Sequence, residues 1–199
     1  ITANFKDYFI NTVAGGSATF FANFGPAPLG NNADATAATV LMANPNDVAV
    51  DSSGNFYLTD TANHIIRKVN GSGITTITGV IDVIGPIGFP DPGFAGDAGL
   101  ATNAQLNSPN GIDVDAAGNI YIADTNNQRI RKIDTSGNIS TIVGSGAFGA
   151  GTGTFTGDNG QATNATLNAP TDVKVDSLGN IYVADTGNHL IRKIDIATG

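Results

Sequence analysis

Hydrophobic and polar residues alternate with a period of two in three blocks of the chain, and this pattern predicts β-strands. The blocks cover residues 45–69, 109–133 and 170–194 and read PNDVAVDSSGNFYLTDTANHIIRKV, PNGIDVDAAGNIYIADTNNQRIRKI and PTDVKVDSLGNIYVADTGNHLIRKI. They have the same length and align without gaps, so the chain contains an internal repeat.

Each block predicts three short strands. A glycine in the first turn (Gly54, Gly118 or Gly179) supplies the positive φ that a tight hairpin needs. A fourth strand is predicted at residues 74–79 and 139–144, which read ITTITG and ISTIVG. A four-stranded antiparallel sheet cannot bury both faces alone, so neighbouring units must stack. The pattern therefore predicts an all-β fold, a β-propeller built from four-stranded blades.

The composition agrees with a fold that is rich in turns. The 199 residues include 26 Gly, and all 17 acidic residues are Asp. Asp and Gly favour caps and turns, whereas the absent Glu favours helices, so a helical bundle is excluded. With 41% hydrophobic residues the chain can bury a core, which excludes global disorder.

The charge and the missing residue types exclude several functions. Nine basic residues and a net charge of -8 argue against nucleic-acid binding, which depends on neutralising phosphates. Without Cys there is neither a disulfide framework nor a thiolate zinc site. No apolar run is long enough to predict a membrane span. The N-terminus lacks both an initiator Met and a signal-peptide pattern, so we expect a processed chain or a fragment.

The segments GNFYLTDTANHIIRK, GNIYIADTNNQRIRK and GNIYVADTGNHLIRK resemble the NHL repeat, which is named for the Asn-His-Leu that stands here at 188–190. The first copy has Asn-His-Ile at 63–65, and the second departs from the pattern with Asn-Gln-Arg at 127–129. The linkers GFAGDAGLATNAQLNSP and TFTGDNGQATNATLNAP resemble those of secreted bacterial NHL proteins and of the teneurin propeller. The resemblance implies a propeller and a secreted protein.

The repeat divides the chain into three NHL-type blades joined by long loops. We expect an N-terminal closing strand in 1–16, blades at 45–79, 109–144 and 170–199, and loops at 17–44, 80–108 and 145–169. The third blade lacks a fourth strand. The segment INTVAGG at 10–16 matches ITTITGV at 74–80 and ISTIVGS at 139–145, so it is a fourth strand that precedes any first strand.

Three blades are fewer than the four to eight of known propellers, so one chain is not expected to close alone. Three arrangements stay open. The chain is part of a longer propeller, or two copies exchange their first strands around a two-fold axis to make six blades, or head-to-tail exchange produces a filament. The expected partners are therefore other copies of the chain or the rest of a longer propeller.

Six polar residues recur at equivalent positions of the three blocks. They are Asp60, Asp124 and Asp185, and Asn63, Asn127 and Asn188. At a junction between strand and turn such side chains bond to backbone amides, and an active site is normally asymmetric around a ring. We interpret all six as structural and predict no catalytic residue.

Metal ligands are few. His64 and His189 share one repeat position, where the second block has Gln128, and a catalytic zinc site usually needs three protein ligands. Asp97 and Asp158 lie in equivalent loops without an acidic cluster, which favours a loop-stabilising role over calcium binding. The sequence predicts no metal or cofactor.

The basic residues Arg67, Arg131 and Arg192 also repeat, each followed by Lys. Because neighbouring residues of a strand point to opposite faces, only one of each pair can line a given surface. Two interpretations stay open: ion pairs between blades with the repeated Asp residues, or a ring that binds an anionic partner.

Positions that differ between repeats are the better candidates for ligand contacts, since a fold keeps what all blades need. They are Ala49, Asp113 and Lys174 in the first strands, and Ala62, Asn126 and Gly187 in the turns. The function that fits is a non-enzymatic, extracellular or cell-surface scaffold that contacts proteins or glycans and self-assembles. The alternative is a metal-dependent lyase or lactonase-like hydrolase with its site in the central channel.

Overall fold

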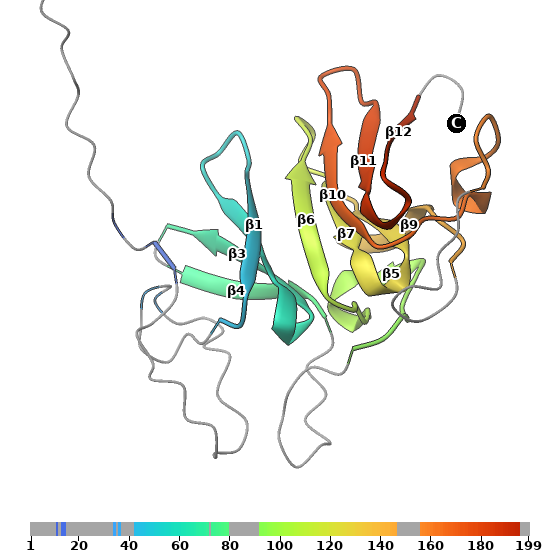
Figure 1. Cartoon of the computed structure of the whole chain (residues 1–199). Coiled ribbons are helices and arrows are strands. Elements are labelled where there is room, and N and C mark those ends of the chain that lie inside the picture. Colours follow the sequence, from blue (N-terminus) through green and yellow to red (C-terminus); the bar gives the residue numbers. More distant parts are fainter. Residues whose placement is uncertain are drawn as a thin grey trace, which may run out of the picture.

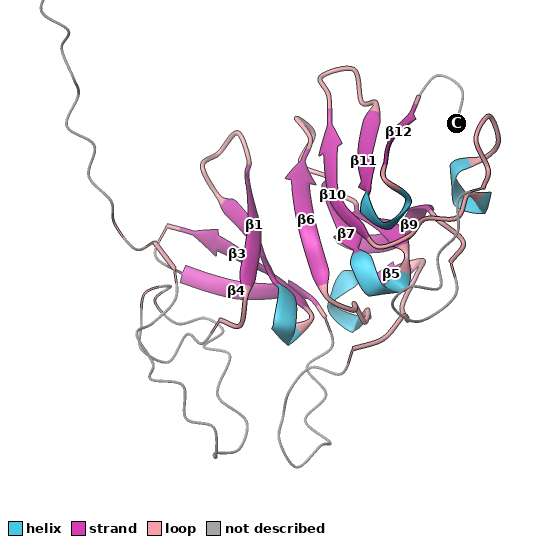
Figure 2. Ribbon diagram, viewed as in Figure 1, coloured by secondary structure: helices cyan, strands magenta, loops and turns pink. Residues whose placement is uncertain are grey.

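The computed structural model describes residues 42–71, 73–79, 92–146 and 156–195, together with residues 11, 13, 14, 34 and 36. Most of the predicted N-terminal closing strand lies outside the described residues, as do large parts of the three long loops. The described part is all-β, and its helical turns are single 3-10 turns of three residues (Figure 2).

The described strands form three antiparallel sheets that follow the repeat (Figure 1). Blade 1 contains β1 (Pro45–Val50), β2 (Phe56–Asp60), β3 (Ile65–Asn70) and β4 (Gly73–Thr78) in that order. Blade 2 contains β6 (Pro109–Val114), β7 (Ile120–Asp124), β8 (Arg129–Ile133) and β9 (Asn138–Val143). Blade 3 contains β10 (Pro170–Val175), β11 (Ile181–Asp185) and β12 (Leu190–Ile194).

Blade 2 has one strand more than the repeat predicts. The two-residue strand β5 (Gly99–Leu100) pairs with the outer side of β9, which places Gly99 opposite Ile139. The sheet order is therefore β5-β9-β8-β7-β6. The loop before blade 2 thus becomes part of that blade.

The turn between the second and third strands is the same in all blades. The 3-10 turns η1 (Thr61–Asn63), η3 (Thr125–Asn127) and η5 (Thr186–Asn188) connect these strands. The residue after each turn has a φ of 57°, in the left-handed region that non-glycine residues seldom adopt. The shared geometry aligns the polar side chains of the turns from blade to blade.

The hydrophobic core lies between the blades. Ile66 of β3 belongs to one cluster with Ile112 and Ile122 of blade 2, and all three side chains are fully buried. The inner strands β1, β6 and β10 run side by side (Figure 1). The linker residues Leu106 and Leu167 are also fully buried, and each joins the cluster at one junction between blades. Further short turns, η2 (Ala101–Asn103) and η4 (Ala162–Asn164), carry the linkers past the sheets.

Candidate functional site

Each blade contains a buried set of Asp, Asn and Arg around the end of its second strand. In blade 1 the Asp60 carboxylate is fully buried, and Nδ2 of Asn63 and Nε of Arg67 donate to its Oδ2 at 2.9 and 2.8 Å. The backbone N–H of Ala43 donates to Oδ1 at 2.7 Å. The carboxylate therefore joins the linker, the turn and the third strand of a single blade.

The other two sets repeat this arrangement with longer distances between the Asp and the Arg. Arg131 Nη1 lies 3.3 Å from Asp124 Oδ2, and both side chains are fully buried. Arg192 Nη1 lies 3.7 Å from Asp185 Oδ2, and the Arg192 side chain is 10% exposed. Burial raises the pKa of Asp124 to about 6, although hydrogen bonds from Asn107 and Asn127 and the charge of Arg131 oppose this shift.

The structure corrects one interpretation of these residues. The arginines pair with the repeated Asp residues, as one interpretation predicts, but within a blade rather than between blades. The repeated Asp also receives a linker amide 17 residues away, not the amides of its own turn. Because Arg67 and Arg131 are fully buried, a partner does not reach their guanidinium groups from the surface of the described residues.

The lysine that follows each arginine points to the opposite face of the sheet. Lys68 lies over the ring of Tyr57 at 5.2 Å, and Lys132 lies over Tyr121 at 5.5 Å. This is the cation–π distance range. Because the two side chains of each Arg-Lys pair point to opposite faces, the Arg charge is buried and the Lys charge lies near the surface.

The histidine position of the repeat joins one blade to the next. The backbone N–H of Ser108, the last linker residue before blade 2, donates to Nδ1 of His64 at 2.9 Å. Burial lowers the pKa of His64, which keeps the ring neutral and able to accept this bond. Gln128 accepts the equivalent amide, that of Ala169, through Oε1. His189 holds the same position in blade 3 and is exposed.

The linker aspartates stabilise their loops through the same arginines. Asp97 lies 2.7 Å from Arg131 Nη2 and accepts a hydrogen bond of 2.6 Å from Thr141 Oγ1 in β9. Asp158 lies 2.7 Å from Arg192 Nη2. Among the described residues, His and Asp side chains form no group of three that could hold a metal ion.

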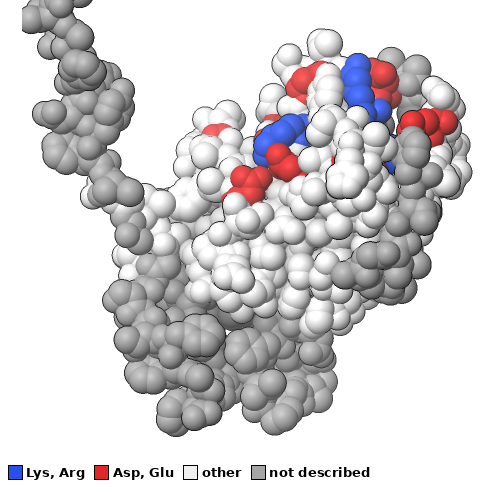
Figure 3. Space-filling view, in the orientation of Figure 1, with Lys and Arg blue, Asp and Glu red and all other residues white. Residues whose placement is uncertain are grey.

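A polar surface of mixed charge lies on the inner strands, and it contains two of the three variable positions of those strands. Lys174 of β10 is half exposed, and its Nζ lies 3.2 Å from both Asp47 of β1 and Asp172. Asp47 also accepts the backbone N–H of Ile112 at 2.9 Å, and Asp113 accepts that of Val175 at 2.7 Å. We call Asp47, Asp113, Asp172 and Lys174 the inner-strand surface. In Figure 3 the charged atoms of the described residues gather toward the upper part of the face shown.

The Lys174 ammonium is the exposed cation of this surface. Burial lowers its pKa, but the carboxylates of Asp172 and Asp47 outweigh that effect, so the pKa is raised and the group stays charged. Ala49, the third variable position of the inner strands, is buried. The sequence prediction missed Asp47, which contacts Lys174 across 127 residues of sequence. Asp47 could have been found as a variable position, because the equivalent residue of blade 2 is Gly111.

The variable turn positions lie against the linkers. The backbone N–H groups of Ala62, Asn126 and Gly187 donate to Ala43, Asn107 and Asn168, respectively. Asn126 also donates through Nδ2 to Ser108 Oγ at 3.1 Å. These positions stabilise the junction between turn and linker, while Asp113 and Lys174 remain with the inner-strand surface.

Two protein-family models together match most of the chain. The NHL repeat model matches residues 42–68 and 167–194, and the Teneurin NHL domain model matches residues 80–153. Teneurin-1 of Gallus gallus is 35% identical over 158 residues, which cover 74% of this chain and 6% of that protein. Teneurin-1 of Homo sapiens is 32% identical over 178 residues, covering 84% of this chain and 6% of the relative. The chain thus spans about 6% of the length of these relatives.

Solved structures share the fold at low sequence identity. An auxiliary nutrient binding protein from Bacteroides ovatus has a TM-score of 0.55 at 19% identity, over 77% of this chain and 37% of the other. A gluconolactonase from Xanthomonas campestris has a TM-score of 0.50 at 14% identity, over 79% and 46%. Both likenesses concern the fold alone. No helix in the part of the chain that the structure describes has the length and apolar character of a membrane span.

Proposed function

Since the chain belongs to the NHL-repeat family of β-propeller proteins, we propose that it is a non-enzymatic scaffold that binds proteins or glycans outside the cell or at its surface. The observation that carries the proposal is a division between two groups of polar residues. The repeated Asp, Asn and Arg side chains are buried in sets that stabilise each blade, whereas the charged residues that differ between blades gather on the inner-strand surface.

The inner-strand surface offers the chemistry of a binding site for polar partners. Lys174 donates hydrogen bonds and carries a positive charge, and the carboxylates of Asp47 and Asp172 beside it are 29% and 45% exposed. Donors and acceptors placed side by side suit the hydroxyl groups of a glycan or the mixed polar groups of a protein surface. The similarity to teneurins supports a scaffold.

Binding to immobilised glycans and to arrayed extracellular protein domains tests this proposal. We expect the wild-type chain to bind, and Lys174→Ala to bind at least tenfold more weakly because the only cation of the inner-strand surface is lost. Lys68→Ala is the matched control, since Lys68 lies over Tyr57 on another part of blade 1, and its binding should stay unchanged.

Metal analysis of the same preparations tests the alternative, a metal-dependent enzyme with a site in the central channel. For a scaffold we expect far less than one metal ion per chain and unchanged binding after chelation. One zinc or calcium ion per chain, together with turnover of a lactone or lyase substrate that chelation abolishes, would overturn the proposal.

A further inference from the structure

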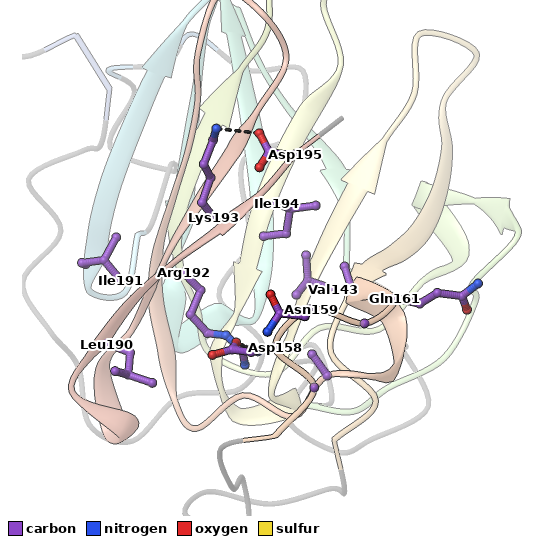
Figure 4. A pocket seen from close by; sticks show the side chains of 14 residues that line it. Val143, Asp158, Asn159, Gln161, Leu190, Ile191, Arg192, Lys193, Ile194 and Asp195 are labelled. Atoms are coloured by element: carbon purple, nitrogen blue, oxygen red, sulfur yellow. Dashed lines mark hydrogen bonds and ion pairs between the residues drawn. The ribbon is translucent and has the colours of Figure 1, made fainter. Parts of the chain in front are cut away.

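A groove runs along β12, the last described strand of blade 3, on the side away from β11. In blades 1 and 2 the equivalent strands β3 and β8 pair with a fourth strand, whereas the described sheet of blade 3 ends at β12. The groove has a volume of about 860 Å³ and lies between Leu190–Asp195 and the linker segment 157–162 (Figure 4). One side of the groove is therefore a row of backbone groups that can pair with another strand.

Both sides of the groove correspond to strands that enclose β9 in blade 2. There β9 lies between β8 and the linker strand β5, with Gly99 opposite Ile139. The linker repeat aligns Gly99 and Leu100 with Gly160 and Gln161, which line the groove of blade 3. The groove thus has the position and the two edges of a fourth strand, which the described residues of blade 3 do not include.

A polar side chain in the groove lacks the neighbour that its counterpart has. In blade 2, Asp97 accepts a hydrogen bond from Thr141 of β9, and its side chain is 33% exposed. In blade 3, Asp158 keeps the equivalent pair with Arg192, but its side chain is 57% exposed. A threonine at the position of Thr141 in an added strand would donate to Asp158.

One segment of the chain has the sequence that this groove requires. INTVAGG at residues 10–16 aligns with ITTITGV at 74–80 and ISTIVGS at 139–145, so Thr12 corresponds to Thr141. It also supplies Gly15 at the position of Gly79 and Gly144, whose φ values are 101° and 96°. A Cβ on Gly79 would lie 2.5 Å from Cγ2 of Ile65, so this position needs glycine.

The described part of this segment lies beside blade 1, not blade 3 (Figure 1). Ala14 packs against a cluster that contains Leu58 of β2. Its counterpart Val143 belongs to a cluster that contains Val183 of β11, the residue equivalent to Leu58. Ala14 therefore packs on blade 1 in the same way that Val143, at the end of β9, packs on blade 3. This is the position that the fourth strand of a preceding blade occupies.

The outer faces of blades 1 and 3 complement each other. Ile191 is 75% exposed, whereas its counterparts Ile66 and Ile130 are fully buried against the next blade. On blade 1, Val48 is 56% exposed, whereas its counterpart Ile112 is fully buried against the preceding blade. The exposed face of blade 3 corresponds to one side of the junction between two blades, and the exposed face of blade 1 corresponds to the other side. The chain forms this junction between blades 1 and 2 and between blades 2 and 3.

We propose that blade 3 receives blade 1 of a second copy of the chain, and that residues 10–16 of that copy enter the groove as an antiparallel strand along β12. By the register of β8 and β9, Asn11 lies opposite Lys193 and Thr12 opposite Arg192. This inference deepens the self-assembly expected of the proposed scaffold and rests on it, but it involves a surface other than the inner-strand surface.

Engineered cysteines test the register directly, because the chain has no cysteine of its own. Opposite residues of paired antiparallel strands have the Cα separation that a disulfide needs. Under mild oxidation, a mixture of the single variants Asn11→Cys and Lys193→Cys should form a covalent dimer of the two different chains. Asn11→Cys mixed with Leu178→Cys is the control, since Leu178 is equally accessible, at 76% exposure, but lies in the first turn of blade 3. It should form at least tenfold less heterodimer.

The solution mass of cysteine-free variants gives a second readout. Light scattering should give twice the chain mass of 20.1 kDa for the wild type. Ile191→Asp should give the single-chain mass with an unchanged circular dichroism spectrum, because the side chain is exposed within one copy. Leu178→Asp should keep the doubled mass.

Several results would overturn the inference. They are a wild-type monomer at tens of micromolar, equal cross-linking of the matched and control pairs, and a disulfide within single chains of the double variant Asn11→Cys/Lys193→Cys. In each case the loss of glycan or protein binding by Lys174→Ala could still be measured, so failure of assembly and failure of the binding function are distinguishable.

Discussion

The buried ion pair of blade 1 allows a sharp prediction about stability. Asp60→Asn keeps the shape of the side chain but removes the negative charge that lies 2.8 Å from Arg67 Nε, where both side chains are fully buried. The new amide can still accept the Ala43 N–H through its oxygen, while its NH₂ group faces donors of Asn63 and Arg67. Breaking one partner of a buried pair costs about 3–5 kcal/mol.

The expected loss is large enough to measure without ambiguity. For a chain of this size each kcal/mol lowers Tm by about 2–4 °C, so Asp60→Asn should lower it by about 6–20 °C. Urea unfolding followed by circular dichroism gives the free energy of unfolding directly. The double variant Asp60→Asn/Arg67→Met should recover part of the loss, because an apolar partner removes the buried charge itself.

Asp185→Asn is the matched control, because it makes the same change at the equivalent position of blade 3. There the ion pair with Arg192 is 3.7 Å long, and Asp158 holds the same guanidinium at 2.7 Å. The expected cost is about 1 kcal/mol, that of one hydrogen bond. Equal losses for both variants, or a loss below about 1 kcal/mol for Asp60→Asn, would refute the argument from burial and distance.

Two further predictions concern the junctions between blades. Burial lowers the pKa of His64 below its ordinary 6.5, so the unfolded chain binds more protons near that pH and stability should fall as the pH drops through 6.5. His64→Gln, which copies Gln128, should reduce the difference in the free energy of unfolding between pH 5 and pH 7.5, measured by urea titration. An unchanged difference would show that His64 is not the source of the pH dependence. Gly111→Ala should cost about 1–3 kcal/mol, since the added Cβ would lie 2.5 Å from Cα of Asp172. A neutral Gly111→Ala variant in thermal unfolding would contradict the close approach of β6 and β10.

The repeat predicts the strands because each residue type serves the same local geometry in every blade. The alternation, the turn glycines and the Asp, Asn and Arg positions are all local, so the sequence shows them without a partner. The pairing within a blade was harder to predict. A ring of equivalent positions allows an arginine to meet either its own aspartate or that of a neighbour, and only side-chain direction decides between them.

The inner-strand surface depends on distances that the sequence does not contain. Asp47 meets Lys174 across blade 2 because Gly111 lets β6 and β10 approach closely. The strand β5 has only two residues and exists only because β9 offers an edge to pair with. Short elements of this kind have too little periodicity to be seen in the sequence and form from tertiary contacts.

The confinement of each repeated Asp–Arg ion pair to one blade has a consequence for how such chains change over generations. A duplicated or deleted repeat carries both charges with it, so no buried charge is left without its counterpart elsewhere. Between blades, the residues at positions 64 and 128 accept backbone N–H groups, which any incoming repeat offers whatever its side chains. A recombination event can therefore alter the number of blades without a second, compensating mutation.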